Sequence, residues 1–280
     1  RKIGMKKIDV IIIGGGPAGI TAAISAKRNY PEKSVLLIRQ EKQTMIPCGI
    51  PYIFGTLANS DQNIIPDASL TKNQIELMVA KVENIDAKNK TVSTSEEKIE
   101  WDRLVIATGS VPFTPPIPGK DLAGVFDIRK DADYLKALKS IIEKANNIVI
   151  VGGGFIGVEF ADEIIKTPGK NVSIIELMPN CLSLSYDVEF CAEAENKLRE
   201  KGVKIYTSTK VLSFNGSEKV ESVNISTGET LAADAVILGI GATSNVSLAE
   251  SAGILTGKSR AIAVDRRMET SVNGIFACGD

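Results

Sequence analysis

Two hydrophobic patterns recur along the chain and predict alternating strands and helices. Short apolar runs rich in β-branched residues, at 10–13 and 148–151, are typical of buried parallel strands. Each run is followed by glycines and then by apolar residues at helical spacing. The predicted strands include 8–13, 34–38, 148–151 and 172–175, and the predicted helices include 17–29, 131–144 and 188–201. This strand-helix-strand order occurs twice and predicts an α/β fold.

Other segments interrupt this rhythm. Residues 75–106 alternate between apolar and polar positions, as β-strands do, with a turn at 87–90. Four prolines between Pro112 and Pro118 exclude a regular element and predict a linker. The residues from 239 onward are too few to form a domain alone, so we expect them to return to the first domain.

Two glycine-rich turns stand between the predicted strands and helices. They read Gly14-Gly15-Gly16-Pro17-Ala18-Gly19 and Gly152-Gly153-Gly154-Phe155-Ile156-Gly157. In a dinucleotide fingerprint the first glycine makes the tight turn, the second admits the pyrophosphate, and the third lets helix and strand pack closely. The helix N-terminus then binds the phosphates. We therefore predict two nucleotide sites on two Rossmann-like domains of the three-layer ββα type, the second inserted into the first.

Composition narrows the chemistry. The chain has 280 residues, 44% of them apolar, with 33 basic and 34 acidic side chains and no histidine. No basic stripe indicates nucleic-acid binding, and no apolar run approaches the length of a membrane helix. Without histidine, hydrolytic triads and metal sites are not expected, so electron or hydride chemistry carried by cofactors is favoured.

The four cysteines show neither zinc-site spacing nor a Cys-x-x-Cys pair. They indicate reduced thiols and a cytoplasmic protein. We expect no signal peptide, and we expect Met5, after Arg1 to Gly4, to be the natural start.

Four motifs in order resemble the pyridine nucleotide-disulfide oxidoreductase family. They are the two glycine turns, a strand ending in Ala107-Thr108-Gly109, and the terminal Cys278-Gly279-Asp280. The resemblance implies FAD at the first turn and NADH at the second, with Asp280 binding the ribityl chain and the backbone of Val82 bordering the adenine. It implies an FAD-binding domain in two parts, 1–120 and 239–280, around an NAD-binding domain at 121–238. It also implies that the chain is truncated before a C-terminal dimerisation domain, and that the full protein is a homodimer.

The segment Pro47-Cys48-Gly49-Ile50-Pro51-Tyr52 discriminates within that family. Ile53 stands where the two-cysteine branch has its second cysteine. The segment resembles instead the branch of coenzyme A-disulfide reductases, NADH oxidases and polysulfide or persulfide reductases, which implies that Cys48 is the catalytic redox thiol. Pro51 suits the first turn of a short helix running to Leu57, whose N-terminus would stabilise a thiolate at Cys48. The alternative is a buried structural thiol.

Acidic residues near the strand ends are candidates for the riboses. Glu176 closes the strand 172–175, where a carboxylate accepts hydrogen bonds from the ribose and repels a 2′-phosphate, so NADH should be preferred. At the first site Arg39 replaces that acid, and either Glu41 substitutes or the ribose is held differently. Glu159 would point toward the flavin-nicotinamide junction, or is an ordinary surface charge. The residues expected to bind the cofactors are Gly14, Gly16, Pro17, Ala18, Gly19, Glu41, Val82, Ala107, Thr108, Gly109, Asp280, Gly152, Gly154, Phe155, Ile156, Gly157, Glu159, Glu176 and Gly241.

These features predict NADH-dependent reduction of a disulfide, persulfide or polysulfide, which could be linked to coenzyme A. One alternative is an NADH oxidase or peroxidase that cycles through a sulfenic acid. It is disfavoured because such relatives place a histidine where this chain has Pro17. Another is a flavoprotein that reduces a small iron-sulfur or rubredoxin-like carrier, in which Cys48 takes no part.

Overall fold

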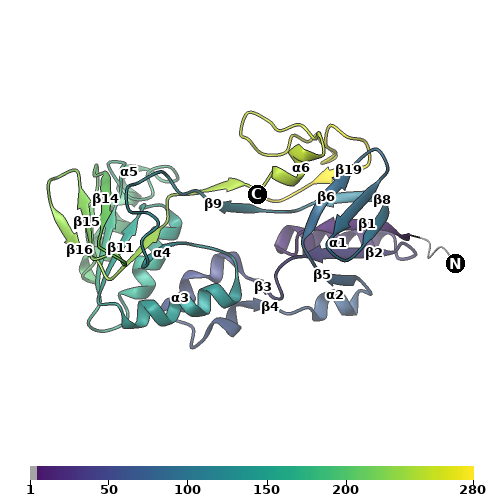
Figure 1. Ribbon diagram of the computed structural model, residues 1–280. Helices are drawn as coiled ribbons and strands as arrows, with labels where there is room; N and C mark the ends of the chain where they lie inside the picture. The colour runs from purple at the N-terminus through teal and green to yellow at the C-terminus, as the bar shows by residue number, and fades with distance from the viewer. Residues whose placement is uncertain (1–4) are drawn as a thin grey trace. The chain divides into compact units, whose positions relative to one another are not determined.

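The computed structural model describes residues 5–280 and divides them into two compact units (Figure 1). Unit 1 comprises residues 5–46, 64–111 and 243–280, and unit 2 comprises residues 47–63 and 112–242. Arg1 to Gly4, which the sequence sets apart from Met5, lie outside the described residues.

Unit 1 is built on a seven-stranded sheet in the order β5-β2-β1-β8-β7-β6, with β19 also paired to β8. The strands β1, β2, β5, β8 and β19 run parallel, and β6 and β7 extend the sheet as an antiparallel meander. One core lies between the sheet and the helices α1 and α2, and another lies under the meander and α6. The elements are β1 (Lys6–Ile13), α1 (Pro17–Asn29), β2 (Val35–Arg39), β3 (Thr44–Met45), β4 (Ile64–Ile65), α2 (Ala68–Lys72), β5 (Glu76–Val79), β6 (Val82–Asp86), β7 (Thr91–Thr94), β8 (Lys98–Ile106), β9 (Ser110–Pro112), α6 (Ser247–Ser251) and β19 (Ile275–Ala277).

Unit 2 combines a parallel sheet, in the order β10-β17-β11-β12-β13, with the three-stranded antiparallel sheet β14-β15-β16. Its core joins the two sheets through buried valine, isoleucine and phenylalanine side chains. The elements are the 3₁₀ helices η1 (Pro47–Gly49), η2 (Pro51–Phe54) and η3 (Ser60–Asn63), then β10 (Val125–Asp127), α3 (Ala132–Lys144), β11 (Asn147–Val151), α4 (Phe155–Ile164), β12 (Asn171–Ile175), α5 (Val188–Glu200), β13 (Lys204–Tyr206), β14 (Val211–Asn215), β15 (Ser222–Ile225), β16 (Thr230–Ala232) and β17 (Ala235–Leu238). The strand β18 (Ala242–Ser244) begins at the last residue of unit 2 and continues into unit 1. The parallel sheets of the two units confirm the predicted α/β class.

The chain leaves unit 1 twice, and each time a two-stranded ribbon closes the base of the excursion. β3 pairs with β4 around residues 47–63, and β9 pairs with β18 around residues 112–242. These crossing points differ from the domain boundaries expected at 120 and 238. The segment 47–63, expected in the first domain, clusters with unit 2 because it packs on α3 and α4.

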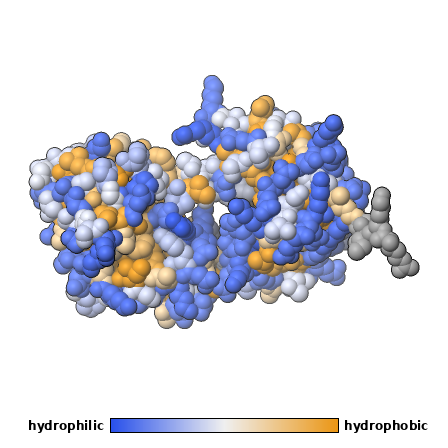
Figure 2. Space-filling model, in the orientation of Figure 1, coloured by the Kyte–Doolittle hydropathy of each residue, from blue (hydrophilic) through white to orange (hydrophobic). Residues whose placement is uncertain are grey.

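The surface is largely polar, with apolar side chains exposed on both units (Figure 2). In unit 2 the segment 177–190, between β12 and the first turn of α5, contributes several of them, with Leu184 at 89% exposed and Phe190 at 67%. In the part of the chain that the structure describes, no helix is long and apolar enough to cross a membrane.

Candidate functional site

The first glycine turn is shaped by close backbone contacts. Gly14 has φ +115°, and a methyl added to it would lie 2.0 Å from the carbonyl oxygen of Ala107. A methyl at Gly19 would lie 1.9 Å from the oxygen of Gly14, so α1 can pack on the strands only with glycine there. At Gly16, by contrast, no atom lies within 4 Å of the added methyl. The turn is therefore closed on the protein side and open at Gly16, where a ligand would approach.

The N-terminus of α1 is available to an anion. Gly16 caps the helix without any side-chain hydrogen bond, and the first turn contains no acidic residue. The N–H groups of Ala18 and Gly19 have no partner within the helix, because helix geometry leaves the first turn unpaired. The helix dipole adds to their attraction for a phosphate. This cradle fits the pyrophosphate of a dinucleotide.

Other predicted residues of the first site come from distant parts of unit 1. Thr108 Oγ1 donates to the carbonyl of Asn245 at 2.7 Å, which ties the strand-end turn 107–109 to the returning chain. Gly279, next to Asp280, has φ +94°, and a methyl there would lie 3.0 Å from Cβ of Ala18. The C-terminal Gly-Asp pair therefore lies against the start of α1. Val82 begins β6 and lines a different hollow, of about 270 Å³, so its proximity to an adenine stays a prediction.

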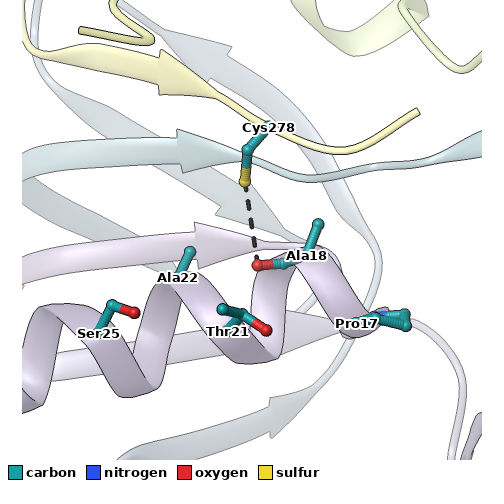
Figure 3. Close-up of a pocket in the computed structure, with 6 residues that line it drawn as sticks. All are labelled: Pro17, Ala18, Thr21, Ala22, Ser25 and Cys278. Carbon is teal, nitrogen blue, oxygen red and sulfur yellow. Dashed lines mark hydrogen bonds between the residues drawn. The ribbon is translucent and has the colours of Figure 1, made fainter.

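A pocket of about 450 Å³ runs along α1 beside Cys278 (Figure 3). Small side chains line it: Pro17, Ala18, Thr21, Ala22, Ser25 and Cys278. The Cys278 thiol donates to the carbonyl of Ala18 at 3.9 Å, and burial raises its pKa. Cys278 is thus a half-buried thiol that packs against α1.

Arg39 is a buried structural cation. Its side chain is 1% exposed, and a methyl added at Gly15 would lie 2.5 Å from its Cδ. The two Nη groups donate to the carboxylate of Asp67 at 2.6 and 2.7 Å. The three remaining N–H bonds go to Glu41 O, Lys42 O and Thr44 Oγ1. Since a guanidinium has five N–H donors, none is left for a ribose. Half-buried Glu41 therefore stays the candidate carboxylate at this strand end.

The second glycine turn repeats the geometry of the first. Gly152 has φ +104°, and its added methyl would lie 2.5 Å from the oxygen of Gly239. A methyl at Gly157 would lie 1.8 Å from Gly152 O, whereas Gly154 faces open space and caps α4 without a side-chain bond. This cradle also fits a pyrophosphate.

Glu176 lies directly beside this second turn. Its carboxylate accepts the backbone N–H of Gly153 at 2.5 Å and that of Met178 at 2.6 Å. A carboxylate offers about four lone-pair directions, so both oxygens can still accept ribose hydroxyls. Arg39 occupies the corresponding place under Gly15, so the two sites differ in charge at this position.

The remaining residues of the second site surround α4. Phe155 and Ile156 are 49% and 38% exposed at its first turn, and the ring of Phe155 packs edge-on against Tyr186 with centroids 5.8 Å apart. Burial, and then the nearby Glu163, raise the pKa of Glu159. Gly241 has φ +107° and accepts the N–H of Phe113, at the point where the chain returns toward unit 1.

Cys48 is an exposed thiol within η1. The following helix η2 ends at Phe54, so the helix predicted to reach Leu57 is shorter than expected. The N–H groups of Gly55, Thr56 and Leu57 all converge on the carbonyl of Tyr52 instead. The predicted buried alternative for Cys48 is therefore wrong in this structure, which leaves its thiol accessible to a substrate.

Two other cysteines are fully buried. Cys181 and Cys191 have no exposed surface, and desolvation raises the pKa of Cys181 to about 12. Among the described residues, no group of histidine, cysteine or carboxylate side chains could hold a metal ion.

Two features were missed in the sequence. The Arg39–Asp67 pair joins residues 28 positions apart, and Tyr186 meets Phe155 from a loop without a recognisable motif. No local pattern marks either contact.

Known proteins resemble the chain over nearly its whole length. The family model described as pyridine nucleotide-disulphide oxidoreductase matches residues 8–280. An NAD(P)H coenzyme A polysulfide/persulfide reductase of Pyrococcus horikoshii is 38% identical over 99% of this chain and 63% of its own length. An NADH oxidase of Methanocaldococcus jannaschii is 34% identical over 96% of this chain and 62% of its own. The solved structure of an NAD-dependent persulfide reductase from A. fulgidus superposes with a TM-score of 0.90 at 32% identity, covering 98% of this chain and 53% of that one.

The chain thus spans less than two thirds of the length of these relatives. The match of the family model to almost every described residue, on a fold with two glycine turns of the same design, shows that the chain belongs to the pyridine nucleotide-disulphide oxidoreductase family.

Proposed function

We propose that the protein is an FAD-dependent NADH oxidoreductase that reduces a disulfide, persulfide or polysulfide through Cys48. The observation that carries the proposal is the exposure of this one thiol, on a segment of unit 2, in a chain with two open dinucleotide cradles. The names of the relatives from P. horikoshii and A. fulgidus support a sulfur acceptor.

The first cradle would hold FAD. Gly16 leaves room for the pyrophosphate, Ala18 and Gly19 offer N–H groups, and Asp280 would bind the ribityl chain beside them. The strand-end turn Ala107-Thr108-Gly109 would complete the wall. When bound, FAD accepts a hydride from NADH and passes the electron pair to sulfur.

The second cradle would hold NADH. Gly154 admits the pyrophosphate, and Glu176 would accept bonds from the adenosine ribose. Its negative charge would repel the extra phosphate of NADPH. Exposed Phe155 and Ile156 would contact the nucleotide at the first turn of α4.

Cys48 would act as the nucleophile and then as the electron acceptor. Its thiolate attacks one sulfur of the substrate, forming a mixed disulfide and releasing the other sulfur as a thiolate or as hydrosulfide. The electron pair from NADH cleaves the mixed disulfide and regenerates the Cys48 thiolate. Overall, NADH, a proton and a disulfide give NAD⁺ and two thiols, and a persulfide gives a thiol and hydrogen sulfide.

The substrate would be a small disulfide or polysulfide, with coenzyme A as one possible carrier, in keeping with the name of the P. horikoshii relative. We propose further that the full protein is a cytoplasmic homodimer, because its four cysteines are free and its family resemblance implies a dimer. Light scattering of the purified full protein tests the dimer.

Replacing Cys48 by serine tests the thiol mechanism. We expect Cys48→Ser to lose NADH-dependent turnover of coenzyme A disulfide and polysulfide while it still binds FAD. Full turnover in the variant would favour a reductase of a small electron carrier instead. Peroxide or oxygen as the only good acceptor would favour the oxidase, as in the M. jannaschii relative.

A further inference from the structure

A buried carboxylate on α4 holds the segment that carries Cys48. Glu163 is 3% exposed, and its Oε2 accepts the hydroxyl of Thr56 at 2.7 Å. Its Oε1 accepts Lys166 Nζ at 2.6 Å, and the same ammonium donates to Thr56 Oγ1 at 2.9 Å. Three groups thus close a triangle: Glu163 from α4, Lys166 two residues beyond the end of α4, and Thr56 two residues beyond the end of η2.

Within unit 2, each residue from 53 to 56 makes its own contact with α3 or α4. Lys139 of α3 donates to the carbonyl of Ile53 at 2.8 Å. The ring of Phe54 packs on Phe160 of α4, with centroids 5.0 Å apart. A methyl at Gly55 would lie 2.2 Å from the carbonyl oxygen of Glu163, so the two backbones are in close contact.

This anchorage extends along the chain to Cys48. The N–H of Ile53 donates to Ile50 O at 3.2 Å, and that of Ile50 donates to Pro47 O at 3.3 Å. Ile50 and Ile53 are 3% and 0% exposed, so η1 and η2 form one packed body. On the other side, a methyl at Gly49 would lie 1.9 Å from Oδ1 of Asn63. The thiol is exposed, but the backbone beneath it is held from both ends.

Holding a segment in place with a buried charged group costs free energy. Burying a carboxylate is expensive unless every partner is in place, and apolar packing often gives equal stability. What a hydrogen-bonded carboxylate adds is direction, since its partners must be at set positions. Phe54 and Phe160 already supply apolar packing here. The triangle of Glu163, Thr56 and Lys166 therefore adds a fixed position for residues 53–56 along α4.

We propose that Glu163, acting through Thr56, is a positioning residue for Cys48. It sets the place of the cysteine segment on α4, the same helix whose N-terminus forms the second glycine turn. This inference rests on the proposed function, because it assigns the purpose of the anchorage to the reaction of the thiol.

The test compares Thr56→Val, which keeps the shape and loses the hydroxyl, with Thr56→Ser, which keeps the hydroxyl. Glu163→Gln is the second variant, and Glu193→Gln is the control, since Glu193 is an exposed acid on α5 that pairs with Lys197 and not with the triangle. Each full-length variant is assayed with NADH and a polysulfide or disulfide acceptor. It is also assayed with ferricyanide, which takes electrons from the flavin without a thiol.

We expect Thr56→Val and Glu163→Gln to lower kcat for the sulfur acceptor on the order of 10- to 100-fold, the range that a misplaced reacting group costs. The KM for NADH and the ferricyanide rate should stay the same, and Thr56→Ser and Glu193→Gln should resemble the wild type. Equal loss of both activities in Thr56→Val would mean general destabilisation and would overturn the inference. An unchanged sulfur-acceptor kcat in Thr56→Val would overturn it too. If Cys48→Ser keeps the sulfur-acceptor activity, the proposed function itself fails and the positioning role with it, a result distinct from the other two.

Discussion

Replacing Asp67 by asparagine should destabilise unit 1 much more than the loss of an ordinary surface ion pair. The substitution leaves the buried Arg39 guanidinium with no countercharge and with one acceptor in place of two. Removing one partner of a fully buried pair costs about 3–5 kcal/mol, whereas an exposed pair contributes about 0–1 kcal/mol. The Asp67 side chain is 43% exposed, and the three acceptors of Arg39 outside Asp67 are unchanged, so we expect an intermediate loss of about 2 kcal/mol.

Urea unfolding followed by tryptophan fluorescence measures this loss of stability in unit 1, which contains both Arg39 and Asp67. Trp101 is the only tryptophan of the chain, and it is 1% exposed in the core of unit 1. With an m-value of about 2 kcal/mol/M, the midpoint should fall by about 1 M. The matched control is Asp121→Asn, because Asp121 is 86% exposed and pairs with Lys120.

Two results would refute this reasoning. One is a midpoint for Asp67→Asn no lower than that of Asp121→Asn. The other concerns the double variant Arg39→Met/Asp67→Asn, which removes the unpaired cation as well. It should be more stable than Asp67→Asn alone, because an uncompensated buried charge costs more than an apolar side chain there. A double variant less stable than the single one would show that the cation was not the source of the loss.

Three further predictions concern the sites and the acid stability. Glu176→Ala should lower the preference for NADH over NADPH in kcat/KM by about tenfold, and a wild-type preference for NADPH would contradict the role of Glu176. Iodoacetamide near neutral pH should alkylate exposed Cys48 first and spare Cys181, whose pKa burial raises to about 12; peptide mass spectrometry showing early labelling of Cys181 would oppose this. Hydrogen bonds from the backbone and then the hydroxyl of Ser34 lower the pKa of Asp9 to about 2. Because this pKa is depressed, Asp9 stabilises the fold above about pH 4, and the contribution is lost as the pH falls toward 2. Asp9→Asn should therefore flatten the acid side of the stability profile, and an unchanged profile would exclude the effect.

The elements around the glycine turns could be predicted because their signals are local. The helix expected at 17–29 forms as α1 (Pro17–Asn29), since proline at its first position and apolar spacing act within the segment itself. The helix expected at 131–144 begins one residue later, with Asp131 as its cap accepting the N–H of Tyr134. The sharp glycine turns follow from the same local rule, because only glycine tolerates the positive φ of Gly14 and Gly152.

Contacts between distant residues could not be predicted in this way. In the sequence, Arg39 stands where an acid that binds the ribose is expected. Its actual role depends on Asp67, which lies 28 positions further along the chain. The segment 47–63 follows the first domain in sequence but packs on α4, through a bond between Thr56 and Glu163 that spans 107 positions. The helix expected to reach Leu57 ends early because Gly55 and the two residues after it all bond to Tyr52 O. In the first two cases a partner distant in sequence decides the outcome, and in the third a local turn replaces the expected helix.

Anaerobic titration of the FAD-loaded full protein with NADH tests the thiol mechanism most directly. A thiolate beside oxidised flavin gives a long-wavelength absorbance band, which the proposed mechanism predicts for the wild type during the titration and not for Cys48→Ser. Both proteins should bind FAD equally. A wild type that binds FAD, is reduced by NADH and shows no such band would contradict Cys48 as the redox centre.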